Sequence, residues 1–310
     1  MQSVDTALAK GRVPKSGRVA PPASRRRSRG VAPTALRLVA YAVLFAGVVV
    51  ALAPFVWMIA TSFKQPQDVF TPTPTLLPTD ARTGVWAPTL DNYLQVLGIG
   101  GFATAFLNSV IVVVILVPAK LLLDALAAYA FARIEFPGRN ALFMVLLATM
   151  MVPGVALLIP KVFITQELGM SDSLTGIIVP NVISAFDIFL LRQFFMTIPR
   201  EVEEAAMLDG ASRIKIFWSL ALPLARPALA VVTITSFIYH WNDLLWPLVI
   251  LSDQEKYTLP LALQALVSGR VGQPQLVMAG AVVAVMPVIV VFLIFQRKIL
   301  EGIALTGLKG

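Results

Sequence analysis

The chain has 310 residues, of which 57% are hydrophobic and only 14% charged, and its mean hydropathy is +0.80. Soluble globular proteins carry about 25% charged residues, so this composition excludes an ordinary soluble domain and indicates a membrane protein. With no cysteine and a single histidine, disulfides, thiol catalysis and cysteine-ligated zinc are excluded, and a histidine-based metal site is disfavoured. The formal charge is +8, but nine of the 25 basic residues lie in the first 37 positions. A tail facing anionic lipid explains that block better than nucleic-acid binding does.

In chain order, the apolar segments predict six membrane-spanning helices. A bilayer core needs about 20 apolar residues, and four stretches of 21 to 28 residues contain no charge at all. Two further stretches each contain one aspartate, Asp187 or Asp243. The first stretch is too long for the apolar part of a signal peptide, so we interpret it as a retained helix. The predicted spans are 38–62, 103–127, 140–162, 173–195, 227–251 and 275–296.

The distribution of basic residues predicts the orientation of the chain. If residues 1–36 form a basic cytoplasmic tail, 19 basic residues fall on the inner side and 5 on the outer side, with Lys120 inside a span. This asymmetry follows the positive-inside rule. The sequence therefore predicts a six-helix domain over 37–310 with both termini cytoplasmic, including a C-terminal tail over 297–310. Segment 199–224 then faces the cytoplasm.

Several ionisable side chains lie inside the predicted spans, where each costs about 2.5–3.5 kcal/mol to insert. Lys120 and Asp124 are one helical turn apart and are predicted to pair with each other. Asp187 has Arg192 as a candidate local partner. Its role is either to line the translocation path or to make a hydrogen bond between helices.

The fifth span ends in the polar and aromatic sequence YHWNDLLWP, residues 239–247. Trp241 and Trp246 fit an aromatic belt at the outer membrane interface. The alternative interpretation is that Asn242 and Asp243 line a polar path. The candidates for the translocation path are Asn108, Asp187, Tyr239, Asn242 and Asp243.

Between the fourth and fifth spans lies a charged, amphipathic segment. TIPREVEEAAMLDG begins with Pro199 at a favourable first helical position, carries carboxylates in its first turns and ends at Gly210, which suits a left-handed cap. Ser212 then caps a second helix, RIKIFWSLAL, which is predicted to stop at Pro223. Carboxylates would lie unfavourably on anionic lipid, so these two short helices are predicted to dock onto another protein.

This segment resembles the coupling motif of permease subunits in binding-protein-dependent ABC importers. Its EAA, DGA and LPL tripeptides begin at Glu204, Asp209 and Leu222, and Pro227 follows. The resemblance implies the type I importer permease fold, an all-α polytopic membrane protein with six transmembrane helices and a cytoplasmic coupling helix between the fourth and fifth. It also implies that the motif fits a groove on a separate ATPase. The residues thereby assigned to ATPase coupling are Glu204, Ala205, Ala206, Asp209, Gly210, Ala211, Leu222 and Pro223.

Other stretches resemble the carbohydrate branch of this family. They are FLNSV at 106–110, AAYAFARIEFPG at 127–138, FLLRQFF at 189–195 and WNDLLWPL at 241–248. The C-terminal GIALTGLKG resembles the tail of the maltose-transporter permease that reaches between the two ATPases. That resemblance implies ATPase contacts from Thr306, Gly307 and Lys309.

By this resemblance the chain is the transmembrane subunit of an ATP-driven sugar importer and forms half of its translocation path. The implied partners are a second homologous permease, two ATPase subunits, an extracytoplasmic solute-binding protein and the lipid bilayer of a bacterial or archaeal inner membrane, with no nucleic acid. The chain would be no enzyme and bind no cofactor, because ATP and Mg²⁺ belong to the ATPase. One alternative is a permease for a polyol, glycerol-phosphate or other small solute. An ion-coupled secondary transporter is another, but it leaves the docking motif unexplained.

Overall fold

The computed structural model describes residues 34–71, 75–80, 82–270 and 272–307. These residues are predominantly helical, and the described part of the chain contains one isolated antiparallel bridge, between Thr79 and Trp86. Backbone contacts divide the chain into two units, Met1–Ala51 and Leu52–Gly310. The second unit contains α2 (Asp91–Gly98), α3 (Phe102–Arg133), α4 (Arg139–Thr149), α5 (Leu158–Glu167), α6 (Leu174–Ile178), α7 (Ala185–Thr197), α8 (Arg200–Leu208), α9 (Arg213–Ile216), α10 (Leu222–Leu224), α11 (Arg226–Trp241), α12 (Leu245–Ile250), α13 (Leu259–Gly269) and α14 (Pro274–Gly307).

Helix α1 (Thr34–Ser62) begins in the first unit and ends in the second. The side chains of residues 36–57 are all exposed, and most of them are apolar. A helix that is apolar on every side and not covered by its own chain is stable in lipid or against another protein. The structure thus agrees with the prediction that this segment is a membrane-spanning helix.

The described residues supply up to six membrane spans, as the sequence predicts. Three helices reach the necessary length without a break, namely α1, α3 and α14. The other three candidates are helix pairs bent by 97° (α4 with α5), 41° (α6 with α7) and 77° (α9–α10 with α11). Helix α11 has 16 residues, about 24 Å, so it needs a neighbouring helix to cross a core of about 30 Å. Two of these bends fall inside the predicted spans 140–162 and 173–195, whereas the third falls where the predicted cytoplasmic segment 199–224 meets the predicted fifth span.

Two packed regions lie along α3 within the second unit. Toward the C-terminus of α3, Ala125 and Ala128 pack against Leu191 and Phe195 of α7, and all four side chains are buried. Small residues at a helix interface let two backbones approach closely, which suits packing in a membrane. Toward its N-terminus α3 packs against α13 and α14 around the buried Trp241.

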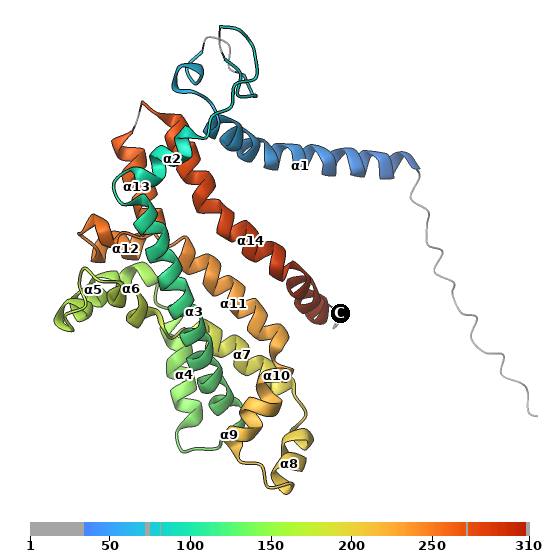
Figure 1. The fold of residues 1–310 in the computed structure, drawn as a ribbon. Coiled ribbons are helices and arrows are strands. Elements are labelled where there is room, and N and C mark those ends of the chain that lie inside the picture. The colour runs from blue at the N-terminus through green and yellow to red at the C-terminus, as the bar shows by residue number, and fades with distance from the viewer. Residues whose placement is uncertain (1–33, 72–74, 81, 271, 308–310) are drawn as a thin grey trace, which may run out of the picture. The chain divides into compact units, whose positions relative to one another are not determined.

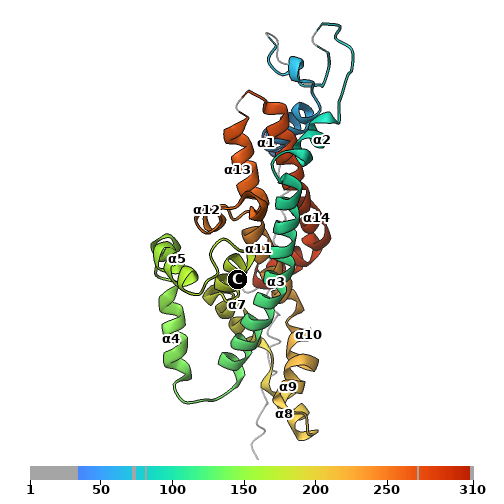
Figure 2. The ribbon, with the colours of Figure 1, turned by 60° about the vertical axis from the view of Figure 1, so that its left-hand side comes forward.

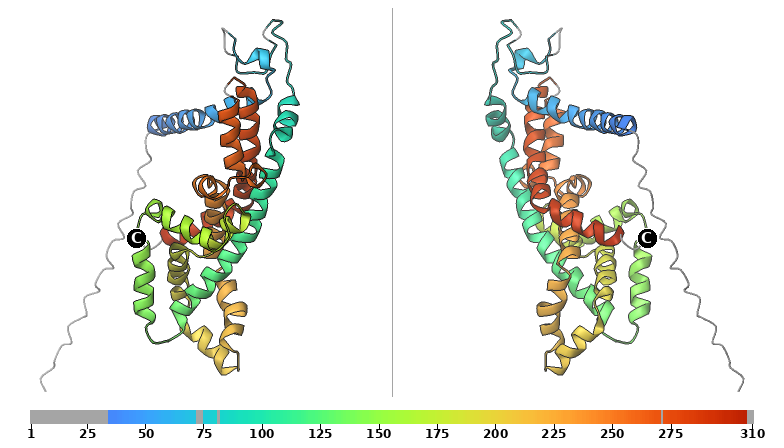
Figure 3. Two further views of the ribbon diagram at one scale, coloured as in Figure 1. Left: turned by 90° about the vertical axis from the view of Figure 1, so that its left-hand side faces the viewer. Right: turned by 90° about the vertical axis from the view of Figure 1, so that its right-hand side faces the viewer.

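Different helices lie at the two ends of the second unit. Helices α8 and α9 form one end, and α2 and α13 lie at the other (Figures 1 and 2). The side views show α3 running between these ends, with α4 and α5 to one side of it (Figure 3). In α2, Asn92 donates hydrogen bonds to the carbonyls of Ser62 and Lys64, at 2.8 Å each, which connect this helix to the end of α1.

Asp172, in the connection before α6, makes hydrogen bonds to the connection that follows α12. Its Oδ1 accepts hydrogen bonds from the amides of Ser252 (2.9 Å) and Asp253 (3.0 Å), and its Oδ2 accepts one from Lys256 Nζ at 2.8 Å. The bond from Lys256, with the two amides, lowers the pKa of Asp172 to about 2. The same contact raises the pKa of Lys256.

We expect the contribution of this contact to stability to depend on pH. An unfolded aspartate has a pKa of about 3.9. Because the folded value is lower, the stabilisation is complete above that pH and is lost as the pH falls through about 2. The pKa of Lys256 is higher in the folded protein than in the unfolded chain, which also adds stability. This second contribution is lost only when the pH rises through the pKa of Lys256 in the folded protein. Thermal unfolding of wild type and Asp172→Asn should differ at pH 6 and converge between pH 4 and pH 2. A difference that is constant over this range would contradict the assignment.

Candidate functional site

The docking segment, residues 199–224, folds as the sequence predicts up to its second helix. Helix α8 ends at Leu208, and Gly210 follows in the left-handed region with φ of 81°. The Ser212 side chain accepts a hydrogen bond from the amide of Lys215 at 3.3 Å and so caps α9. The predicted glycine turn and serine cap are confirmed. Pro199 precedes the helix as its N-cap rather than occupying its first position.

The second helix is predicted to stop at Pro223 and ends one residue later, at Leu224. After α9 the chain makes a π-helical turn over Phe217–Ala221 and continues through Pro223 in α10. Such a wide turn alters the hydrogen-bond pattern just where the proline lacks its N–H. The change of direction comes later, at Ala225, where α10 meets α11 at the 77° bend.

Half of the eight motif residues in the docking segment are exposed. Glu204, Ala205, Asp209 and Gly210 are exposed, whereas Ala206, Ala211, Leu222 and Pro223 are half-buried. Large apolar side chains accompany them, including Leu208 (90% exposed), Ile214 (73%) and Trp218 (54%). Apolar side chains beside exposed carboxylates are typical of a surface that another protein covers.

Sequence analysis overlooked two residues that hold this segment in place. Glu203 was interpreted only as a helix-start carboxylate, and Arg133 as one of the inner-side charges. In the structure both are buried, and Arg133 Nε lies 3.0 Å from Glu203 Oε1. The two residues are far apart in the chain, so no local pattern could have revealed the pair.

A buried ionic cluster joins α3 to α7. Lys120 forms the predicted ion pair with Asp124, at 2.8 Å between Nζ and Oδ2, and a second one with Asp187. Ser236 of α11 donates a hydrogen bond to Asp187 at 3.2 Å. Asp187 is therefore held between helices and has no local contact with Arg192, which instead donates to the carbonyl of Phe131. The suggested Asp187–Arg192 pairing is wrong because Lys120 meets Asp187 across the helix interface.

This cluster forms one wall of a cavity of about 430 Å³. The other polar groups that line it are Asn181, Ser184, Thr235, Ser236, Tyr239 and His240, with Ile183 and Phe186 as apolar neighbours. The exposed Tyr239 ring lies at its edge. Two of the predicted path residues, Asp187 and Tyr239, thus meet at one cavity, and its size suits a small ligand.

The other three predicted path residues lie away from this cavity. Asn108 is buried and donates hydrogen bonds to the carbonyls of Glu255 (2.9 Å) and Tyr257 (3.0 Å). Asn242 is exposed and donates to the carbonyl of Ile238 at 2.7 Å. Asp243 accepts from the amide of Trp246 at 3.3 Å, just before α12. These contacts organise helix ends and the loop before α13.

The tryptophans assigned to an aromatic belt lie inside the fold. Trp241 is 2% exposed and donates to the carbonyl of Ala284 at 2.9 Å, and Trp246 is 4% exposed and donates to that of Gly176 at 3.0 Å. The belt interpretation is wrong because each indole N–H finds a backbone partner within this chain.

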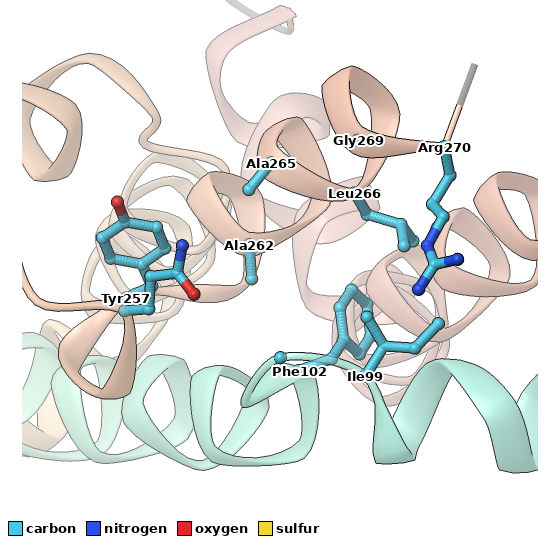
Figure 4. A pocket seen from close by; sticks show the side chains of 10 residues that line it. Ile99, Phe102, Tyr257, Ala262, Ala265, Leu266, Gly269 and Arg270 are labelled. Atoms are coloured by element: carbon cyan, nitrogen blue, oxygen red, sulfur yellow. The ribbon is translucent and has the colours of Figure 1, made fainter.

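A smaller cavity of about 160 Å³ lies between α13 and the start of α3. Figure 4 shows Arg270 extending toward Ile99 and Phe102, with Tyr257 at the opposite side. Ligand pockets usually exceed about 300 Å³, so this cavity is too small for a sugar.

Of the predicted tail contacts, Thr306 and Gly307 lie in the last turn of the α14 backbone. Lys309 and the basic segment before residue 34 lie outside the described residues.

Comparison with known proteins identifies the family. Residues 125–303 match the model of the binding-protein-dependent transport system inner membrane component. The chain belongs to this family. It is therefore a permease component of an inner-membrane ABC importer rather than an enzyme, and its family is not one that binds a cofactor. The matched region contains the whole docking segment and every residue that lines the larger cavity except Lys120.

Relatives of this permease come from several uptake systems. It is 33% identical over 221 residues to the arabinooligosaccharides transport system permease protein AraQ of Bacillus subtilis, covering 71% of this chain and 79% of AraQ. It is 34% identical to the diacetylchitobiose uptake system permease protein NgcG of Streptomyces coelicolor, with 86% and 87% covered. It is also 34% identical to the sn-glycerol-3-phosphate transport system permease protein UgpE of Pectobacterium atrosepticum, with 86% and 96% covered.

A solved structure shares the fold. It is the crystal structure of a bacterial ABC transporter involved in the import of the acidic polysaccharide alginate. The TM-score is 0.77 at 26% identity, and the match covers 86% of this chain and 97% of that one. The predicted importer-permease fold is thereby confirmed.

Proposed function

We propose that this permease is one of two homologous membrane subunits in an ATP-driven importer of neutral sugars. Two ATPase subunits would dock from the cytoplasm onto residues 199–224, and an extracytoplasmic binding protein would deliver the solute from the other side. Both termini would be cytoplasmic, with residues 1–36 as a basic tail and the permease domain over 37–310. The exposed motif residues Glu204, Ala205, Asp209 and Gly210 support the docking assignment, together with their exposed apolar neighbours Leu208 and Ile214.

The C-terminal segment adds a finer proposal. Resemblance of GIALTGLKG to the maltose-transporter tail supports contacts from Thr306, Gly307 and Lys309 to the ATPases.

Gly210 offers a direct test of the docking assignment. A Cβ there would meet no atom within 4 Å, so any cost comes from the left-handed backbone, about 1–2 kcal/mol for a β-branched residue. We expect Gly210→Val to distort the turn and reduce solute uptake by the reconstituted importer at least tenfold while the chain still inserts in the membrane. Gly210→Asn is the matched control, because asparagine tolerates this conformation. Normal uptake by the valine variant would exclude the segment from coupling.

The larger cavity is the observation that carries the choice of a neutral sugar. Hydroxyl and amide groups of Asn181, Ser184 and Thr235, together with the Tyr239 ring, can bind a polyhydroxylated solute. A phosphate would need a free cation or an open helix N-terminus. Lys120 is already occupied by two carboxylates, and the amide of Ser184, at the start of α7, donates to Asp124 at 3.0 Å. The relatives AraQ and NgcG, named for oligosaccharide uptake, agree with this choice.

The experiment is uptake by the complete importer in proteoliposomes. Neutral oligosaccharides and glycerol-3-phosphate would be compared as radiolabelled solutes. We expect uptake of a neutral oligosaccharide but not of glycerol-3-phosphate, and a loss of at least tenfold in Tyr239→Ala. Tyr41→Ala, which removes an equally exposed tyrosine from α1, should leave uptake unchanged. Transport of glycerol-3-phosphate alone would refute the neutral-sugar proposal, and full uptake by Tyr239→Ala would exclude the cavity from the path.

A further inference from the structure

Helix α8 is attached to the membrane helices through an unusual residue. Its buried side chain is Glu203, which is 6% exposed, whereas Val202 and Glu204 on either side are exposed. A short helix on a protein surface normally attaches through apolar side chains, and a carboxylate is almost never buried without a partner. The attachment of α8 therefore depends on what surrounds this carboxylate.

Two side chains near the C-terminus of α3 bind both oxygens of Glu203. Arg133 Nε lies 3.0 Å from Oε1, with both side chains less than 10% exposed, and the two groups form an ion pair without hydrogen-bond geometry. The Tyr129 hydroxyl donates a hydrogen bond to Oε2 at 3.2 Å. Arg133 uses its Nη2 to donate to the carbonyl of Phe195 at 2.7 Å and to that of Ile198. The guanidinium thus joins the end of α3, the end of α7 and α8.

The part of the docking segment that follows Gly210 contacts the same region of α3. The Tyr129 ring packs on Phe217, in the π-helical turn after α9, with ring centroids 5.3 Å apart. Its other neighbour is Phe195 of α7, at 5.7 Å. Both arms of the segment, before and after Gly210, are therefore fixed to one point on α3.

We propose that Glu203, held by Arg133 and Tyr129, is the joint through which movement of the docking segment reaches the membrane helices. This inference rests on the proposed coupling to an ATPase. The two charges of an exposed ion pair can separate at little cost, because water then solvates each of them. Breaking a buried pair instead leaves a charge without solvation. The joint accordingly holds α8 rigidly to α3, so a displacement imposed on α8 moves α3 and α7 with it. Glu203 and Arg133 act as positioning residues and contact neither the solute nor the nucleotide.

The first test separates ATP hydrolysis from transport. In the complete importer reconstituted in liposomes, Glu203→Gln keeps the length of the side chain but removes its charge. We expect the ATPase to remain bound and to hydrolyse ATP, while solute moved per ATP falls at least tenfold. Glu201→Gln is the matched control, because Glu201 is an exposed carboxylate on the same helix. Unchanged transport per ATP in Glu203→Gln would overturn the proposal.

A second measurement uses wild-type side chains at the joint and so does not depend on the variant folding. The chain contains no cysteine, so Arg200→Cys on α8 and Leu126→Cys on α3 can be spin-labelled selectively. Both positions are exposed. Pulsed electron paramagnetic resonance should give the same distance between the labels without nucleotide and in an ATP-trapped state. A distance that changes between the two states would show that α8 moves relative to α3, and the joint would be refuted.

The two proposals fail in different ways. If no ATPase copurifies with the wild-type chain, the proposed function fails first. If the ATPase binds and transport is normal in Glu203→Gln, the docking assignment stands and the joint alone is rejected.

Discussion

Replacing Lys120 by methionine is expected to lower the free energy of unfolding by about 3–5 kcal/mol, the typical cost of removing one partner from a buried ion pair. Lys120 lies between Asp124 and Asp187, and its side chain is 6% exposed. Without its ammonium group, two carboxylates would face each other with no cation between them. Thermal unfolding of the purified chain in mild detergent measures the loss.

The charge count supplies the control for this experiment. The cluster holds one positive and two negative groups, so Asp187→Asn leaves one balanced pair, Lys120 with Asp124. Its loss of stability should therefore be much smaller than that of Lys120→Met. The triple variant Lys120→Met, Asp124→Asn, Asp187→Asn should recover part of the stability, because no buried charge remains. If Asp187→Asn and Lys120→Met lose the same free energy of unfolding, charge balance does not determine the stability of this cluster.

Gly176→Ala should be the most damaging single-methyl change in the described part of the chain. A Cβ at this position would lie 2.1 Å from the carbonyl oxygen of Met170 and 3.4 Å from Thr165 Cγ2. The first neighbour is backbone and has little room to retreat, so we expect a cost of about 3 kcal/mol or more. A shift of Gly176 would also disturb its carbonyl, which accepts the hydrogen bond from Trp246.

Gly154→Ala is the matched control for this change. A Cβ at Gly154 meets no atom within 4 Å. The variant should unfold at the wild-type temperature, whereas Gly176→Ala should unfold well below it or fail to accumulate in the membrane. A small effect of Gly176→Ala would mean that the connection between α5 and α6 adjusts more easily than its geometry indicates.

The parts of the fold that depend on neighbouring residues could be predicted from the sequence. Gly210 and Ser212 act within a few positions of themselves, so the turn and the cap were correct. The four-residue spacing of Lys120 and Asp124 revealed their pair for the same reason. Uncharged runs predicted six candidate spans, in agreement with the structure's upper number, because length and hydropathy are local quantities.

Contacts between distant segments could not be predicted in this way. Nothing near Asp187 indicates that Lys120 reaches it from another helix, and nothing near Glu203 indicates Arg133. In the sequence Trp246 fits an interfacial position, and only the structure shows that its indole N–H donates to the carbonyl of Gly176. The bends between α4 and α5 and between α6 and α7 each lie within an apolar stretch that is long enough for one span, so hydropathy averaged over that length does not reveal them.

The 77° angle at Ala225 has a mechanical consequence for α11. A displacement along the axis of α9–α10 acts almost entirely across the axis of α11 and hardly along it. Helix α11 would consequently tilt instead of sliding lengthwise. A tilt sweeps Ser236 and Tyr239 sideways past α7 and alters the width of the cavity, while the depth of each side chain in the bilayer changes little.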